Sequence, residues 1–126
     1  MFEPFIYIST HRIKEGKIEA TKVWNREFVK LVEAKEPRLI ASHLYLNESQ
    51  SEGTIVLIHP DADSMDFHLR VAGDLIGEGL ALAPTGSIQV YGTPSPMLQE
   101  VLRRNAESGV PVSITTHHLG GFTRCA

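Results

Sequence analysis

The sequence has one cysteine, no long apolar run and no excess of positive charge. Because Cys125 is the only cysteine, a reduced, cytoplasmic protein is the expectation. The apolar runs have the length of strands, well short of the roughly 20 residues of a membrane-spanning helix. Met1 to Pro4 carry no basic segment, so no secretory signal is predicted. The net charge of -3 and the scattered lysines and arginines predict no nucleic-acid partner.

What is present is an ordinary globular composition. Hydrophobic residues make up 42% and charged residues 21% of the 126 residues, which excludes a disordered chain. A compact domain of this length buries roughly two-thirds of the surface that its unfolded chain exposes. No repeat or low-complexity segment divides the sequence. Residues 1–126 are therefore predicted to form a single domain.

The periodicity of apolar residues predicts alternating strands and helices. Strands are expected at 5–9 (ending near His11), 38–46, 54–59, 87–91 and 110–118. Helices are expected at 14–35 and 95–109, and a further helix should begin at Pro60 and weaken at Gly73. Pro37 should end the first helix and Ser95-Pro96 should begin the last. Asp61, Asp63 and Asp66 lack the EF-hand pattern, so helix capping is the better explanation.

The order β-α-β-β-α-β is the ferredoxin-like split βαβ pattern, in which strands one and three lie side by side. The fold class predicted is therefore α+β with an antiparallel sheet. Residues 4–92 would form this core, and 93–126 would add a C-terminal helix and strand.

Alternating positions along the predicted strands differ in character. Even positions are mostly aliphatic and are expected to pack under the helices. A hairpin that places His43 opposite Leu57 would gather the odd positions on the other face. Those odd positions are mainly aromatic or polar: Phe5, Tyr7, His11, His43, Tyr45, His59, Gln89 and Tyr91. Such a face predicts a covered cavity with polar groups, closed by a second subunit.

Three features carry a resemblance to a known family: Ile13-Lys14-Glu15-Gly16-Lys17 before the first helix, the hairpin, and Phe67-His68-Leu69 on the second helix. Over roughly residues 4–92 the sequence resembles the dimeric α/β-barrel superfamily, particularly antibiotic biosynthesis monooxygenase-like domains. The resemblance implies a homodimer with two sheets packed face to face. It also implies a ligand pocket, either between each sheet and its helices or inside the barrel. The segment from Ser95 to Ala126 departs from the minimal domain and can reach across to a partner subunit.

Three histidines, His11, His43 and His59, are expected to approach one another near one end of the odd face. Neutral imidazoles in that arrangement can act as general acid and base, or can bind a metal. The plainer alternative is three partly exposed histidines at strand ends or at a dimer interface.

A second group of candidates concerns ligand binding. Tyr7, Tyr45, Gln89 and Tyr91 either line a site for an apolar or aromatic ligand or pack a dimer interface. His68 is similar to a histidine often found at that point of the family, so the resemblance implies a ligand-binding role for it.

The leading hypothesis is a homodimeric, monooxygenase-like enzyme that acts on an apolar organic substrate without a dedicated cofactor. One alternative is a non-catalytic dimeric protein, ligand-binding or stress-associated, with the same pocket. Another is a metal- or haem-dependent site that uses His11, His43 and His59.

Overall fold

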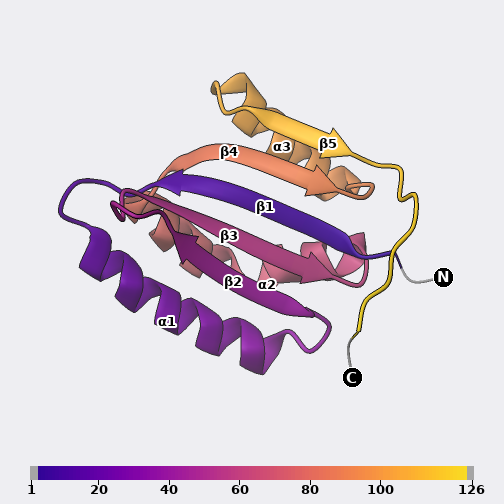
Figure 1. Ribbon diagram of the computed structural model, residues 1–126, viewed down its shortest axis with the longest axis horizontal. Coiled ribbons are helices and arrows are strands. Elements are labelled where there is room, and N and C mark those ends of the chain that lie inside the picture. The colour runs from indigo at the N-terminus through magenta and orange to yellow at the C-terminus, as the bar shows by residue number, and fades with distance from the viewer. Residues whose placement is uncertain (1–2, 125–126) are drawn as a thin grey trace.

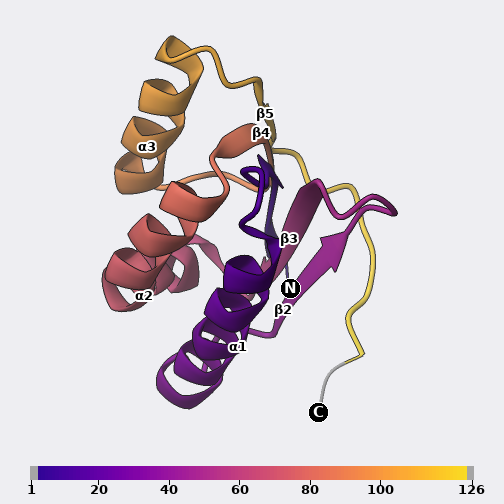
Figure 2. The same ribbon diagram turned by 90° about the vertical axis from the view of Figure 1, so that its left-hand side faces the viewer.

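The computed structural model describes residues 3–124, so Cys125 lies outside the described part. Its elements are β1 (Phe5–Arg12), α1 (Ile18–Lys35), β2 (Ala41–Leu46), β3 (Glu52–His59), α2 (Ala62–Leu82), β4 (Thr85–Tyr91), α3 (Pro96–Glu107) and β5 (Val112–Thr115). The strands form one sheet in the order β2-β3-β1-β4-β5. All the labelled helices lie on one face of this sheet, and the other face is open (Figures 1 and 2). The α+β class is confirmed.

The first six elements have the ferredoxin-like arrangement that the sequence predicted. β1 and β3 are antiparallel neighbours in the middle of the sheet, from Phe5 opposite His59 to Arg12 opposite Glu52. After α3 the chain adds β5 parallel to β4, which is the edge position expected for a strand that begins near Pro111. None of the helices within residues 3–124 is long and apolar enough to cross a membrane.

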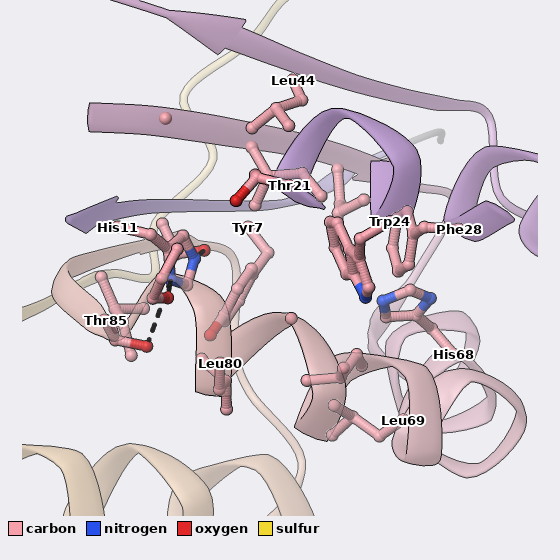
Figure 3. A pocket seen from close by; sticks show the side chains of 18 of the residues that line it. Tyr7, His11, Thr21, Trp24, Phe28, Leu44, His68, Leu69, Leu80 and Thr85 are labelled. Carbon is pink, nitrogen blue, oxygen red and sulfur yellow. Dashed lines mark hydrogen bonds between the residues drawn. The ribbon is translucent and has the colours of Figure 1, made fainter. Parts of the chain in front are cut away.

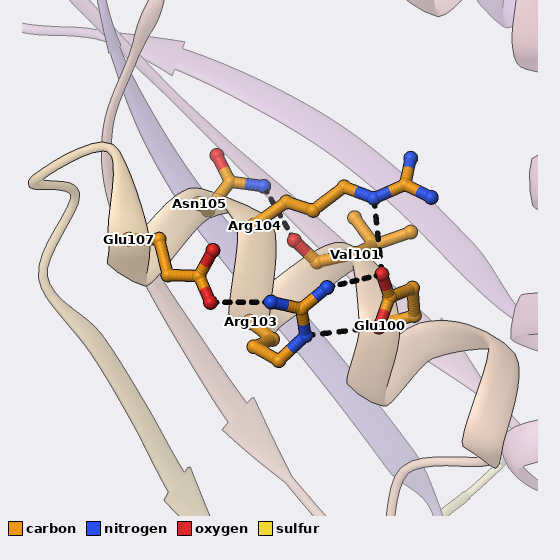
Figure 4. Close-up of polar contacts among 6 residues, drawn as sticks. All are labelled: Glu100, Val101, Arg103, Arg104, Asn105 and Glu107. Atoms are coloured by element: carbon orange, nitrogen blue, oxygen red, sulfur yellow. Dashed lines mark hydrogen bonds and ion pairs between the residues drawn. The ribbon is translucent and has the colours of Figure 1, made fainter.

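Helix ends follow the predicted capping chemistry. The side chain of Asp61 accepts a hydrogen bond from the Ser64 amide at 2.9 Å, and Ser95 accepts one from the Leu98 amide at 3.1 Å. Each satisfies one of the backbone donors left open at a helix N-terminus. The outer side of α3 carries exposed ion pairs in which Arg103 bonds Glu100 and Glu107 (Figure 4). Such exposed pairs typically contribute little to stability.

The second helix is longer than its glycines predict. α2 continues past Gly73 and Gly77 to Leu82, so the weakening of the helix expected at Gly73 is wrong. The reason is packing: a Cβ built on Gly79 would lie 2.6 Å from the indole of Trp24 on α1. Glycine at this position lets the two helices approach, and tertiary contact overrides its poor helix propensity.

Gly79→Ala is expected to destabilise the protein by about 1–3 kcal/mol, because the added methyl must displace Trp24 in a packed interface. Gly77→Ala is the matched control, since nothing lies within 4 Å of its Cβ position in the same helix. It should raise stability by up to about 1 kcal/mol through helix propensity. Urea denaturation of both variants measures the difference, and equal effects would contradict the packing argument.

The assignment of strand faces needs correction. In β1 and β3 the odd positions face the helices, and in β2 and β4 the even positions face them. The expected pairing of His43 with Leu57 is wrong, because His43 pairs with Val56. On the other side of β1, Ser9 pairs with Ile88 of β4. A register shift of one residue moves every side chain of a strand to the other face. The aliphatic even positions of β1 and β3 therefore lie on the open face, not under the helices.

The open face is formed by three rows of paired residues. In order from β2 toward β5 the rows are Ala41-Ile58-Ile6-Tyr91-Thr115, His43-Val56-Ile8-Gln89-Ser113 and Tyr45-Thr54-Thr10-Ser87. Four aliphatic side chains of β1 and β3 occupy its centre, and aromatic or polar groups surround them. We call this surface the open face.

Candidate functional site

A cavity of about 160 Å³ lies between the sheet and the helices. Its walls are mostly apolar, and residues from four strands and all three helices contribute to them. Polar groups enter it from Tyr7, Ser9, His11, His68 and Thr85. Figure 3 shows side chains of the sheet and of the helices directed into the same space. An apolar cavity of roughly 150 Å³ holds a molecule the size of benzene, so a small organic ligand fits.

One of the residues that line the cavity, His68, belongs to a buried histidine–carboxylate pair. His68 on α2 donates from Nδ1 to the carboxylate of Glu36, at 2.9 Å and 3.0 Å to the two oxygens. Both side chains are 2% exposed. The carboxylate fixes the proton on Nδ1 and leaves Nε2 as the basic nitrogen, and Nε2 has no hydrogen-bond partner among residues 3–124. The Phe28 ring lies nearly perpendicular to the imidazole, with the ring centroids 5.7 Å apart.

His59 lies behind His68, outside the cavity wall. Its ring centroid is 5.8 Å from that of His68, and its Nδ1 is 2.7 Å from the hydroxyl of Ser64. The side chain is completely buried, and its Nε2 makes no hydrogen bond within the described residues. Burial lowers the pKa of His59 to about 4, and the neighbouring His68 acts in the same direction. His59 is therefore neutral in the folded protein.

This burial predicts a loss of stability in mild acid. The unfolded chain protonates His59 below about pH 6.5, whereas the folded protein does so only near pH 4. Between these values the unfolded state binds more protons, so the free energy of unfolding falls as the pH is lowered. We expect a loss of about 2 kcal/mol from His59 between pH 7 and pH 5.

Urea denaturation at the two pH values tests this, with His59→Gln as the comparison. The variant should lose most of the pH dependence, and the remainder should come from His11, whose pKa is also lowered by burial. An unchanged pH dependence in His59→Gln would show that another group is responsible.

At the other end of β1, Ser9 and His11 form a second polar pair. The Ser9 hydroxyl lies 2.7 Å from Nε2 of His11, and Nδ1 lies 3.2 Å from the carbonyl oxygen of Ala83. The hydroxyl of Thr85 is 3.5 Å from the same Nδ1 (Figure 3). Burial lowers the pKa of His11, against an opposing effect of the Ala83 carbonyl. This imidazole is therefore also neutral at pH 7.

Tyr7 supplies a third polar group. It lies on the same face of β1 as Ser9, since side chains two residues apart on a strand share a face. Burial raises the pKa of Tyr7 to about 12, so the phenol is a neutral hydrogen-bond donor. Figure 3 shows its ring extending from the strand toward Leu80, a cavity residue that is partly exposed.

The expected cluster of His11, His43 and His59 does not form. His11 pairs with Gly53 and His59 pairs with Phe5, so they lie at opposite ends of the sheet, about 20 Å apart at 3.3 Å per residue. His43 is on the open face. Among residues 3–124 no group of three or more His, Cys, Asp or Glu residues is placed to hold a metal ion. The histidine metal site expected from these three positions is thus wrong in its geometry.

The predicted ligand-binding residues are divided between the two faces. Tyr7 and His68 line the cavity. Tyr45, Gln89 and Tyr91 lie on the open face, where the ring of Tyr45 is 6.4 Å from that of His43. The reason is again the strand register. Their part in ligand binding stays a prediction that requires a partner on that face.

Two residues of the site are absent from the sequence-based candidates. Glu36 is separated from His68 by 32 positions, and no local pattern relates them. Its place between the end of the first helix and Pro37 indicates only a helix terminus. Ser9 was identifiable, because a serine two residues before His11 on a strand must share its face.

Comparison with known proteins shows which solved structures have a similar fold. No protein-family model matches the chain, and a search of curated proteins gave no significant match. The structure is similar to MupZ from Pseudomonas fluorescens, with a TM-score of 0.74, 22% identity, and coverage of 98% of this chain and 91% of that one. An antibiotic biosynthesis monooxygenase gives a TM-score of 0.61, 18% identity and coverage of 72% and 99%. A variant of SnoaB, a cofactor-independent oxygenase from Streptomyces nogalater, gives 0.61, 10%, and 75% and 96%.

The similarity to MupZ extends over nearly the whole chain and so includes the C-terminal helix and strand. At these identities the comparisons concern the fold. They confirm at that level the resemblance suggested by the sequence: this chain has the ferredoxin-like fold of the antibiotic biosynthesis monooxygenase-like proteins.

Proposed function

We propose that this protein is a small-molecule enzyme that transfers a proton to or from an apolar organic substrate held in the cavity, without a dedicated cofactor. The observation that carries the proposal is His68, which lines a mostly apolar cavity and is held by the buried carboxylate of Glu36. A histidine oriented by a carboxylate through Nδ1 presents Nε2 as a general base. Its low-dielectric surroundings strengthen every electrostatic interaction with a bound substrate.

The substrate class follows from the walls of the cavity. Trp24, Phe28 and Leu57 offer aromatic and aliphatic surface, which suits a single aromatic ring or a compact alkyl group. Tyr7 would donate a hydrogen bond to an oxygen of the substrate, and His11 would provide a second neutral imidazole.

Removal of a proton from a phenol or an enol gives an electron-rich anion. Such an anion can pass an electron to dioxygen without a metal or flavin, so the proposed base is compatible with monooxygenase-like chemistry. The similarity in fold to SnoaB, a cofactor-independent oxygenase, supports this choice of reaction.

The proposal includes a homodimer in the cytoplasm. The centre of the open face exposes Ile6, Ile8, Val56 and Ile58 side by side, an apolar patch that a second copy would cover. The segment after β5 runs along the side of the sheet that faces away from the helices (Figure 2). Leu119 is fully exposed there and Phe122 is 82% exposed, which is typical of residues that pack against another subunit.

Oxygen uptake and product formation with a panel of phenols, quinols and enolisable ketones test the activity. His68→Asn is expected to lower turnover by at least about 100-fold, the usual contribution of a general base. His117→Asn, on the exposed C-terminal segment, is the control and should leave turnover unchanged. Binding of panel compounds without turnover by the wild type would instead support the non-catalytic ligand-binding alternative, and equal turnover in both variants would exclude His68 as the base.

A further inference from the structure

A serine, a histidine and a carbonyl group meet in hydrogen-bonding order at one wall of the cavity, and the proposed proton transfer at His68 does not use the serine. Ser9 and His11 are two residues apart on β1, so both side chains face the helices. The Ser9 hydroxyl and the His11 Nε2 atom are 2.7 Å apart. Ser9 itself is only 3% exposed, so its hydroxyl is shielded from bulk water and accessible chiefly from the cavity.

The positions of the protons follow from the partners. The carbonyl oxygen of Ala83 can only accept a hydrogen bond, so Nδ1 of His11 carries the proton and donates it at 3.2 Å. In the neutral imidazole Nε2 is then the acceptor, and the Ser9 hydroxyl must donate to it. Burial of His11, which lowers its pKa, favours this neutral form. Nucleophile, base and an acceptor that orients the base are thus present in hydrogen-bonding order.

We propose that Ser9 is a nucleophile toward small acyl esters bound in the cavity, with His11 as its general base, so that the protein has an acyl-transfer activity separate from the proton transfer at His68. The cavity of about 160 Å³ holds a group the size of benzene, so it takes a short acyl group, and a larger aryl or alkyl leaving group would extend past the partly exposed Leu80. Tyr7 brings a neutral hydroxyl donor to the same face, two residues before Ser9, for the oxygen of the ester carbonyl.

The reaction is a balanced substitution at the carbonyl carbon. Oγ of Ser9 forms a bond to that carbon while its proton moves to Nε2 of His11. The bond to the leaving oxygen breaks, and the alcohol departs with the proton from Nε2. Water then attacks the acyl-serine by the same route in reverse, which releases a carboxylic acid and restores Ser9. Neither an oxidant nor a metal takes part.

The test is acylation by 4-nitrophenyl acetate. The wild type should release a burst of 4-nitrophenolate equal to one per chain, and peptide mapping by mass spectrometry should place one acetyl group on Ser9. Ser9→Ala should remove this adduct, and His11→Gln should slow its formation at least 10-fold. Ser42→Ala is the matched control, a half-buried serine on the helix-facing side of the adjacent part of the sheet, and should keep the full burst.

Location of the acetyl group on the wild-type chain decides the matter even if a variant folds poorly. An adduct on a lysine, on a tyrosine or on the amino terminus in place of Ser9 would overturn the proposal. So would a wild type that shows neither burst nor adduct, or a His11→Gln variant that is folded by circular dichroism and acylated at the wild-type rate.

Discussion

Replacing Ile8 with glutamate is expected to convert the proposed dimer into monomers at micromolar concentration. Ile8 lies at the centre of the open face, on the central strand, between Val56 of β3 and Gln89 of β4. In a dimer built on this face, two copies of a substituted carboxylate would be buried close to each other across the symmetry axis. Burial of an unpaired charge costs several kcal/mol per ion, and each 1.4 kcal/mol changes the dissociation constant tenfold.

The measurement is molar mass by light scattering over a range of concentrations, with circular dichroism as a check on folding. Val23→Glu is the control, because it places the same charge on an apolar residue that is 51% exposed on the surface of α1. That variant should remain a dimer. A wild type that is monomeric at all concentrations would exclude the dimer, and a dimeric Ile8→Glu variant would place the interface elsewhere.

The Ile8→Glu variant also tests whether the cavity depends on the dimer. The cavity lies on the opposite side of the sheet from Ile8, so its ligands do not touch the proposed interface. Turnover per chain that persists in a folded Ile8→Glu monomer would show that each subunit carries a complete site.

The topology was predictable because it depends on features that single segments carry. Periodicity, caps and Pro37 identify strands and helices one at a time, and the β-α-β-β-α-β order leaves few ways to connect them. The face of each strand depends instead on pairing. The loop between Leu46 and Gly53 sets His43 opposite Val56, and a shift of one residue in that loop was enough to separate His43 and Tyr45 on the open face from Tyr7, which faces the helices.

The site was predictable only in part, for a related reason. Tyr7, His11 and His68 were identified as candidates from local pattern or resemblance, and all three line the cavity. Glu36 was not, since its partner is on another helix and only the packing of α1 against α2 joins them. The expected proximity of the three histidines failed for a similar reason. β1 and β3 are antiparallel, so His11 and His59, each near the C-terminal end of its strand, lie at opposite ends of the sheet.

Loss of the Glu36 carboxylate is expected to destabilise the protein more than loss of any exposed ion pair. Glu36→Ala should lower the free energy of unfolding by about 1–3 kcal/mol, because it leaves the Nδ1 donor of His68 buried without its partner. Glu33→Ala is the control, since Glu33 is exposed on α1 three residues before Glu36, and it should change stability by less than about 0.5 kcal/mol. Urea denaturation at pH 7 provides both values.

Glu36→Gln separates the structural from the catalytic part of this role. The amide oxygen can still accept the hydrogen bond from Nδ1, so most of the stability lost in Glu36→Ala should return. The negative charge that stabilises a protonated His68 is absent, so turnover should stay lower than in the wild type by roughly 10- to 100-fold. A Glu36→Ala variant as stable as Glu33→Ala would mean that the carboxylate does not hold His68, and full turnover in Glu36→Gln would leave the carboxylate with a structural role only.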